Sequence, residues 1–199
     1  MATARPLLRT RSLVPMHDPA AVTGLILAGG ASTRFGTDKA LAELGGLPFV
    51  SLVHAALAAH AGTMLVATGA EPRAYPIAAR VVLDAAPDGG PLAGLLAGLA
   101  AADTPWLLSA AVDLPYLTPA ALRPLLAGDA DGLDAVVATA DGRRQPTCAL
   151  WRVRTVAPVV AEQIRAGRLA LHALLERLVV GEAEVEGGAL HNVNTPGDL

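Results

Sequence analysis

The residues best suited to chemistry lie in one short stretch, residues 22–39, which reads VTGLILAGGASTRFGTDK. It opens with a mostly apolar run of the length of a buried strand, and Gly29 and Gly30 follow directly. A glycine pair after a strand lets a ligand approach the main chain closely. Arg34 and Lys39 then supply two cations, the side chains that bind phosphate oxygens in proteins. The stretch therefore predicts a polyphosphate-binding loop.

The spacing in this loop excludes three common motifs. It contains no Walker A sequence, no dinucleotide-binding glycine pattern and no nucleophile elbow. The plainer interpretation is a tight turn followed by a solvated charged loop, with Arg34 in a surface ion pair. Two rare residue types favour a site: Lys39 is the only lysine among fifteen Lys and Arg residues, and the only two asparagines, Asn192 and Asn194, lie together. Arg does not replace Lys where a compact ammonium group is needed.

Polar residues also follow the other predicted strands. Each of these residues stands at the end of an apolar run or in the short segment after it: Thr68, Asp84, Asp113, Gln145, Asn192 and Asn194. Carboxylates bind hard cations such as Mg²⁺, and a glycine-rich backbone with cations binds phosphates. Asp84 is equally well explained as a helix cap, and the two asparagines as turn formers. Taken together, however, the set indicates chemistry on a free nucleotide.

Composition limits the class of protein. The 199 residues are 53% hydrophobic and carry a net charge of −3, so no broad basic surface for nucleic acid is expected. A single cysteine, Cys148, excludes an internal disulfide and a cysteine-based zinc site. No apolar run reaches the roughly 18 residues of a membrane span, and residues 1–20 lack the apolar core of a signal peptide. We expect a disordered tail at 1–20, one domain at 21–199, and a cytoplasmic monomer or weak homo-oligomer.

Predicted strands alternate with predicted helices along the whole domain. The expected strands are 22–27, 63–68, 81–83, 106–113, 133–139, 145–152 and 179–185, and the expected helices are 49–60, 91–102, 118–127, 155–166 and 169–178. This order predicts a three-layer α/β/α sandwich with a mostly parallel, doubly wound sheet, as in Rossmann-like folds. In such sheets ligands bind at the carboxyl ends of the strands, near the point where the strand order reverses.

The loop also matches the pattern L-A-G-G-x-S-x-R-x-G-x-D-K, and four further segments follow in order: GPLAG at 90–94, VDLP at 112–115, RQP at 144–146 and NVNTPGDL at 192–199. Together these segments resemble the MobA-like nucleotidyltransferase family, which includes the molybdenum cofactor guanylyltransferases. The resemblance covers residues 22–199.

The resemblance implies transfer of GMP from GTP to molybdopterin with release of pyrophosphate, and Mg²⁺ as the cofactor. Carried over by position, the catalytic residues are Lys39, Arg34 and Asp113, and Asp113 is also the metal ligand. The nucleotide-binding residues are Leu27, Ala28, Gly29, Gly30, Lys39, Thr68, Asp84, Gly90 and Asp113. The acceptor-binding residues are Gln145, Asn192 and Asn194.

Other functions remain open at this point. Ala67 and Thr68 stand where the guanylyltransferases often carry an asparagine, which leaves the choice of base undecided. A cytidylyltransferase, or a nucleotidyltransferase acting on a sugar phosphate or another small phosphate, has a similar loop. A non-catalytic nucleotide-binding protein on the same fold is the alternative outside the enzyme class, and the presence of Lys39, Arg34 and Asp113 favours the enzyme.

Overall fold

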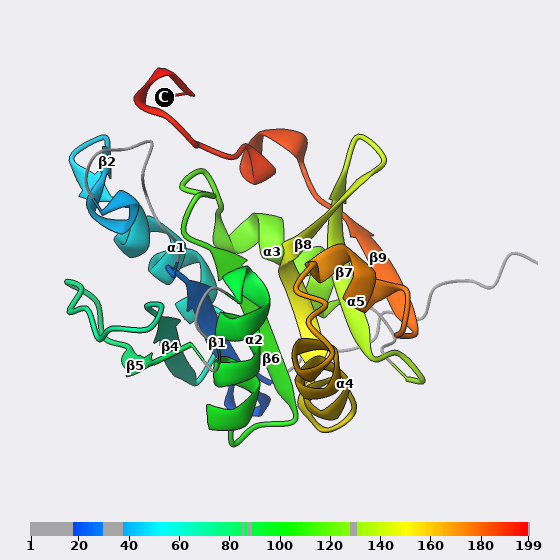
Figure 1. The fold of residues 1–199 in the computed structure, drawn as a ribbon. Coiled ribbons are helices and arrows are strands. Elements are labelled where there is room, and N and C mark those ends of the chain that lie inside the picture. Colours follow the sequence, from blue (N-terminus) through cyan, green and yellow to red (C-terminus); the bar gives the residue numbers. More distant parts are fainter. Residues whose placement is uncertain (1–17, 30–37, 85, 87–88, 128–130, 199) are drawn as a thin grey trace, which may run out of the picture.

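The computed structural model describes residues 18–29, 38–84, 86, 89–127 and 131–198. Most of the predicted tail and residues 30–37 of the glycine-rich loop, with Gly30 and Arg34, therefore lie outside the described residues. Within these ranges the chain forms one seven-stranded sheet in the order β5-β4-β1-β6-β8-β7-β9 (Figure 1). The strands are β1 (Val22–Leu27), β4 (Thr63–Ala67), β5 (Arg80–Val82), β6 (Trp106–Ala111), β7 (Ala135–Ala140), β8 (Arg143–Arg152) and β9 (Val180–Glu184).

The sheet confirms the predicted doubly wound, mostly parallel arrangement. Strand β1 pairs in parallel with β4 on one side and with β6 on the other, so the strand order reverses at β1. Only β8 runs antiparallel to its two neighbours among the described strands. A tight turn explains this reversal: Asp141 and Gly142 both adopt positive φ, 51° and 71°, as a two-residue hairpin of the Asp-Gly type requires.

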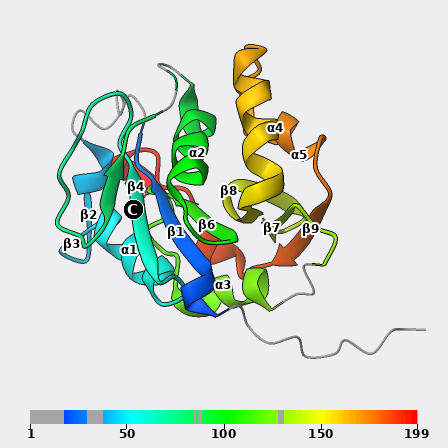
Figure 2. The ribbon, with the colours of Figure 1, turned by 90° about the horizontal axis from the view of Figure 1, so that it is seen from below.

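Helices cover both faces of the sheet, giving the predicted three layers (Figure 2). Their bounds are α1 (Phe49–Ala58), α2 (Gly90–Ala101), α3 (Pro119–Leu126), α4 (Val153–Arg165) and α5 (Leu171–Leu175). Helices α1 and α3 pack on one face, and α2, α4 and α5 on the other. Alternate residues of β1 serve the two faces: Ile26 packs with the first group, Leu25 and Leu27 with the second. Strands buried on both sides explain the continuous apolar runs of the sequence.

Helix α2 lies unusually close to the sheet because of its glycines. A Cβ atom added at Gly98 would overlap the side chain of Leu25, which is fully buried on β1. A Cβ added at Gly94 would lie 3.1 Å from Leu27 Cδ2. The helix begins at Gly90, whose φ of +57° suits glycine, with Pro91 in its first turn. The site end of α2 is thereby held directly against the end of β1.

Three local features differ from the predictions. Ahead of the predicted helix at 49–60, Glu43–Leu44 (β2) and Leu47–Pro48 (β3) form a small hairpin that was not predicted, because Gly45 and Gly46 adopt positive φ. Helix α4 begins at Val153, two residues before the predicted start. Helix α5 spans half of its predicted length, because residues 167–170 instead close the end of α4: the Arg168 N–H donates to Gln163 O, and Gln163 Nε2 donates to Ala170 O.

The chain after β9 crosses the carboxyl edge of the sheet. It passes through the short 3-10 helix η3 (Gly187–Leu190) and the extended residues 191–194, and ends the described chain in η4 (Pro196–Asp198). Figure 1 shows this segment running from β9 over the top of the sheet toward β2. Two further 3-10 turns are η1 (Pro19–Ala21), directly before β1, and η2 (Lys39–Leu41), which follows the first loop. The C-terminal segment is thus placed over the strand ends.

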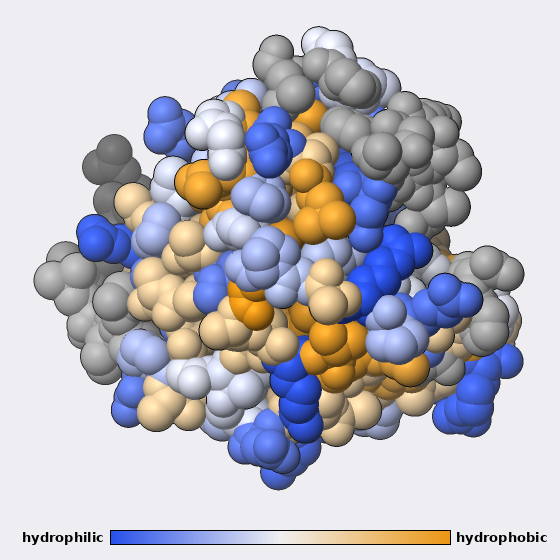
Figure 3. All heavy atoms as spheres, turned by 90° about the vertical axis from the view of Figure 1, so that its left-hand side faces the viewer, coloured by the Kyte–Doolittle hydropathy of each residue, from blue (hydrophilic) through white to orange (hydrophobic). Residues whose placement is uncertain are grey.

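The surface on the β5 side of the molecule is mixed in character. Figure 3 shows apolar and polar side chains interspersed on this face. Exposed large apolar residues of the chain include Leu41 in η2, Leu47 in β3, Val81 in β5 and Leu83 directly after β5. Among the described residues, no helix has the length and apolar character needed to cross a membrane.

Candidate functional site

The carboxyl ends of β1 and β6 lie side by side at the point where the strand order reverses. Leu27 is in register with Ala111, and the Val112 N–H donates to Leu27 O at 3.1 Å. Asp113 therefore follows β6 immediately beside the start of the glycine-rich loop. This is the position at which ligands bind in doubly wound sheets.

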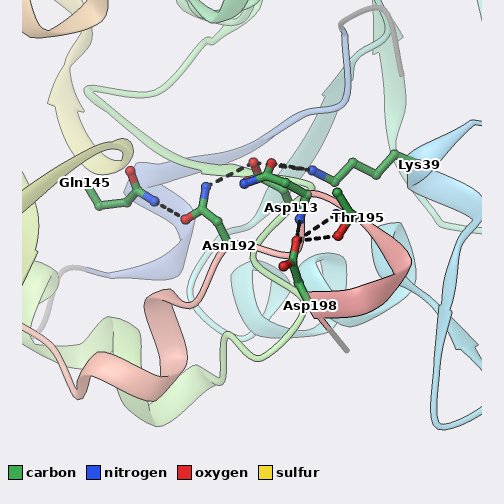
Figure 4. A network of polar contacts seen from close by, with 7 residues as sticks. Lys39, Asp113, Gln145, Asn192, Thr195 and Asp198 are labelled. Atoms are coloured by element: carbon green, nitrogen blue, oxygen red, sulfur yellow. Dashed lines mark hydrogen bonds and ion pairs between the residues drawn. The ribbon is translucent and has the colours of Figure 1, made fainter. Parts of the chain in front are cut away.

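The Asp113 carboxylate is the centre of a polar network (Figure 4). Its Oδ2 accepts a hydrogen bond from Asn192 Nδ2 at 3.1 Å and pairs with Lys39 Nζ at 3.6 Å. Its Oδ1 is buried and has no hydrogen-bond partner within the part of the chain described here. A buried carboxylate oxygen without a partner is costly unless a cation or donor completes it. One oxygen of Asp113 is thus held by the protein, and the other is available to a ligand.

The extended segment 192–194 brings both asparagines to this carboxylate. Val193 points away into the core, is fully buried, and its N–H donates to Asp113 O at 2.9 Å. Because side chains alternate along an extended chain, Asn192 and Asn194 point the other way. Asn194 Oδ1 accepts a hydrogen bond from Lys39 Nζ at 3.0 Å. The apolar residue between the two asparagines therefore anchors both of them in the site.

Gln145 joins the same network from β8. Its Nε2 donates to Asn192 Oδ1 at 2.6 Å, so the Asn192 amide accepts from Gln145 and donates to Asp113. The register between β7 and β8 shifts between Val137 and Ala138, where Gln145 is paired. Such irregularities change the direction of side chains and occur often next to functional sites. The hydrogen bond from Gln145 orients the Asn192 amide, and the hydrogen bond from Asn192 in turn orients the Asp113 carboxylate.

Asp84 lies on the other side of the β1 end, between two glycines. A Cβ added at Gly29 would lie 3.0 Å from Asp84 Oδ2, and one added at Gly94 would lie 3.3 Å from Asp84 Oδ1. Burial raises the pKa of this carboxyl, an effect that a hydrogen bond from the Gly69 backbone partly offsets. Asp84 Oδ1 is also buried without a hydrogen-bond partner among the described residues. Side chains on the two glycines would fill this space.

The turn that carries Lys39 is anchored by Asp38, Arg73 and Tyr75, which were not among the predicted site residues. Asp38 caps η2 by accepting the Ala40 N–H at 3.0 Å. Its second oxygen accepts from Arg73 Nη1 at 3.2 Å and from Tyr75 Oη at 3.1 Å. Burial, followed by the Asp38 charge, raises the pKa of Tyr75 to about 12. The position of Asp38 before Lys39 was a possible capping signal, but no local pattern identified Arg73 and Tyr75.

The structure brings most of the predicted site residues together. One network contains Lys39, Asp113, Gln145, Asn192 and Asn194. Leu27, Ala28 and Gly29 form the end of β1 beside it, Asp84 lies against Gly29, and Gly90 opens α2. Thr68 does not join the network, because it is buried and its hydroxyl donates to Glu71 O at 2.8 Å.

A hollow of about 420 Å³ opens on the α5 side of β8. It is lined by Pro91, Arg144, Pro146, Thr147, Leu171, His172, Leu175 and Glu176. These residues include the start of α2 and both sequence neighbours of Gln145. The hollow therefore adjoins the strand that contributes Gln145 to the network.

The donor set suits a metal shared with phosphate oxygens. The described residues contain no group of three His, Cys, Asp or Glu side chains that could hold a metal by themselves. Mg²⁺ is commonly bound by one or two carboxylates together with substrate phosphates and water. Asp113 Oδ1 fits this role, and Lys39 provides a cation beside it. The arrangement is suited to stabilising negative charge on a polyphosphate.

Comparison with known proteins identifies relatives over most of the chain. Residues 24–181 match the MobA-like NTP transferase domain. The molybdenum cofactor guanylyltransferase of Cereibacter sphaeroides is 38% identical over 181 residues, covering 88% of this chain and 92% of that protein. The molybdenum cofactor guanylyltransferase of Cupriavidus pinatubonensis is also 38% identical, over 192 residues, covering 89% of this chain and 94% of that protein.

Solved structures share the fold. The molybdopterin-guanine dinucleotide biosynthesis protein A of Archaeoglobus fulgidus superposes with a TM-score of 0.70 at 23% identity, covering 88% of this chain and 94% of that one. The 2-C-methyl-D-erythritol 4-phosphate cytidylyltransferase of Thermus thermophilus gives a TM-score of 0.67 at 21% identity, covering 87% and 93%. With its sequence matched over residues 24–181, this chain belongs to the family of MobA-like NTP transferases.

Proposed function

We propose that this protein transfers GMP from GTP to the phosphate of a molybdopterin acceptor and releases pyrophosphate. The observation that carries the proposal is the pairing of Asp113 with Lys39 at the strand-order reversal, with Asp113 Oδ1 left for a cation. The choice of GTP and molybdopterin is supported by the relatives, which are named molybdenum cofactor guanylyltransferases.

The proposed reaction is an in-line displacement at the α-phosphorus of GTP. An oxygen of the acceptor phosphate forms a new bond to this phosphorus, while the bond to the bridging oxygen of the β-phosphate breaks. The electron pair of that bond leaves with pyrophosphate. Reactions of this type depend on positioning and charge stabilisation, so no covalent enzyme intermediate is required. Lys39 is placed to hold negative charge on the departing group. Arg34, from the sequence motif, is proposed to share this role.

Asp113 is the proposed Mg²⁺ ligand. When bound, Mg²⁺ offsets the charge that develops on the phosphate oxygens. The protein's own part is to keep the Asp113 carboxylate oriented, which the Asn192 hydrogen bond to Oδ2 does. Gln145 supports this orientation by donating to Asn192. A carboxylate fixed in this way has little rotational freedom to lose when it binds a cation.

The remaining predicted residues divide between the two substrates. The backbone of 27–30, with Gly90 at the start of α2 and Asp84 between two glycines, is the proposed nucleotide-binding edge. Thr68 is expected to contribute through the turn that it stabilises. Gln145, Asn192 and Asn194 are proposed to face the acceptor phosphate. Their amide groups are neutral, so acceptor binding there adds no charge repulsion.

The direct test is an assay with the purified full chain, Mg²⁺, molybdopterin and each of GTP, CTP, ATP and UTP in turn. The proposal expects pyrophosphate and a molybdopterin-guanine product with GTP, and neither when Mg²⁺ is chelated. A thermal shift with Mg²⁺ and nucleotide gives a second readout. A ligand at about 100 times its dissociation constant adds roughly 2.7 kcal/mol to stability. Preference for CTP, or product only with another phosphate acceptor, would overturn the guanylyl assignment.

Asp113→Asn provides the first mutational prediction. The substitution keeps the shape of the side chain but removes its charge, so we expect the rate of pyrophosphate release to fall about 100-fold or more. Asp103→Asn is the matched control, because Asp103 is exposed and lies before β6, at the opposite end of that strand. Circular dichroism should show both variants folded. Full activity in Asp113→Asn would remove this carboxylate from the mechanism.

A further inference from the structure

A tight turn follows the two asparagines, and a single carboxylate oxygen holds it closed (Figure 4). Asp198 Oδ2 accepts hydrogen bonds from the Asn194 N–H at 2.8 Å, the Thr195 N–H at 2.7 Å and the Thr195 hydroxyl at 3.1 Å. The two backbone hydrogen bonds are the main reason why the pKa of Asp198 lies below its usual value. Asp198 is therefore ionised, and an ionised acceptor forms the stronger kind of hydrogen bond.

Asn194 stands between two fixed points. On one side, Val193 is buried and its N–H is bonded to Asp113 O. On the other side, Asp198 holds the Asn194 backbone N–H. The backbone of Asn194 is thus restrained in both directions, and its side-chain oxygen reaches Lys39 Nζ at 3.0 Å. Without the second anchor, Asn194 would begin a free exposed turn.

We propose that Asp198 is a positioning residue for Lys39: it closes the 194–198 turn and so keeps the Asn194 amide oxygen on the Lys39 ammonium group. Lysine needs such help because its charge sits on a flexible four-carbon chain with three rotatable donors. Asp113 and Asn194 both contact the ammonium group, at 3.6 Å and 3.0 Å. The positioning role itself does not depend on the proposed function. Only its expected consequence does, namely that a displaced Lys39 binds the triphosphate less well.

The test uses the fact that Lys39 is the only lysine in the sequence. The rate at which its amine is acetylated by a small reagent is read by mass spectrometry on the peptide that contains it, in the whole folded protein. Asp198→Ala should raise this rate about fivefold, the loss expected for one hydrogen bond of ordinary strength. Asp198→Asn should recover part of the protection, because its amide oxygen still accepts a hydrogen bond. Asp103→Asn should leave the rate unchanged.

A double variant shows whether Asp198 acts through Asn194. Asn194→Ala alone should raise the acetylation rate to a similar extent, and the combination with Asp198→Ala should add little more. Fully additive effects, or an unchanged rate in Asp198→Ala, would overturn the proposal. If Asp198→Ala fails to fold, Thr195→Val provides the measurement, because it removes only one of the three donors to Asp198. That variant should show a smaller increase of the same sign, and no increase counts against the proposal.

Binding of GTP with Mg²⁺ separates this inference from the proposed function. We expect Asp198→Ala to raise the KM for GTP about fivefold and to lower kcat less, since Lys39 remains present but is held less firmly. If the unsubstituted protein neither binds nor uses GTP, the proposed function fails while the acetylation result still decides the role of Asp198. If the protein uses GTP and Asp198→Ala changes neither acetylation nor KM, only the positioning role fails.

Discussion

At the scale of single residues, the site combines a lysine, a carboxylate and amide side chains in complementary roles. Asn192 can donate to Asp113 and accept from Gln145 at once, which no other side chain of its size does as well. Asn194 accepts a hydrogen bond from Lys39 through its side-chain oxygen. This explains why a chain that contains only two asparagines has both of them here.

The identity of Lys39 is itself testable. We expect Lys39→Arg to lower the transfer rate about tenfold or more although the charge is kept, because a planar guanidinium cannot occupy the place of a compact ammonium between Asp113 and Asn194. The rate is measured under saturating GTP and acceptor. The reverse exchange Arg154→Lys, at an exposed position of α4, serves as the control and should have no effect. Equal rates for Lys39→Arg and the parent protein would contradict the argument.

Asp84 predicts a particular dependence of stability on pH. Because burial raises its pKa, the folded protein holds the proton more firmly than the unfolded chain does. This contribution to stability is therefore greatest when Asp84 is protonated. It declines as the pH rises from the ordinary range of carboxyl titration through the raised pKa of the folded state.

Asp84→Asn should remove that decline and make the unliganded protein more stable at neutral pH. Urea unfolding over a pH series, compared with Asp103→Asn, measures the effect. A loss of stability at neutral pH in Asp84→Asn would show that its carboxylate is stabilised by contacts stronger than the burial penalty. Nucleotide affinity in the same variant tests the proposed binding role separately.

At the level of secondary-structure elements, the close contact of α2 with β1 shapes the proposed nucleotide-binding edge. The helix brings Gly94 against Leu27 and Asp84, and Gly98 against Leu25. Any outward movement of α2 would separate Gly94 from both Leu27 and Asp84. The small residues of this helix are therefore a requirement of the site as well as of the core.

Gly98→Ala tests this packing. The added Cβ would overlap Leu25, which is fully buried and has little room to move. Overpacking costs about 1–3 kcal/mol, while replacing a helical glycine by alanine gains about 1 kcal/mol. We expect a net loss of roughly 1 kcal/mol in the free energy of unfolding. Gly188→Ala is the control, since no atom lies within 4 Å of its added Cβ; a stabilised Gly98→Ala protein would contradict the packing argument.

At the scale of the whole molecule, one sheet separates two apolar layers that share every central strand. Strand β1 contributes to both layers, so loss of either helical layer exposes the strands on which the other depends. We therefore expect the described domain to unfold as one cooperative unit. The buried cysteine offers a way to measure this.

Burial raises the pKa of the Cys148 thiol to about 12. In the folded protein almost no reactive thiolate is then present at neutral pH, and Cys148 is fully inaccessible. We expect a thiol reagent to label the native protein only as fast as the chain unfolds, and to label it at once in denaturant. Because the sequence has a single cysteine, the labelling rate reports global opening directly. Rapid labelling of the native protein would show local opening of β8.

Local sequence patterns were enough to predict the main strands and helices and their order along the chain. Apolar runs and turn residues predicted the main strands and helices, and the alternation that makes a doubly wound sheet. They also placed Asp113 and the glycine-rich loop at strand ends, where a parallel sheet brings such residues together. These features depend on local propensity and periodicity, which a short stretch of chain carries in its own residues.

Which distant residues come into contact could be learned only from the three-dimensional fold. Lys39 contacts Asn194 and Asp113, and Arg73 and Tyr75 anchor Asp38, because of the strand order and the path of the C-terminal segment. Likewise, the turn closed by Asp198 bears on the site only because Asn194, whose backbone Asp198 holds, contacts Lys39. No local pattern encodes such partners, since contacts between distant segments are selected by the packing of the whole sheet and its helices.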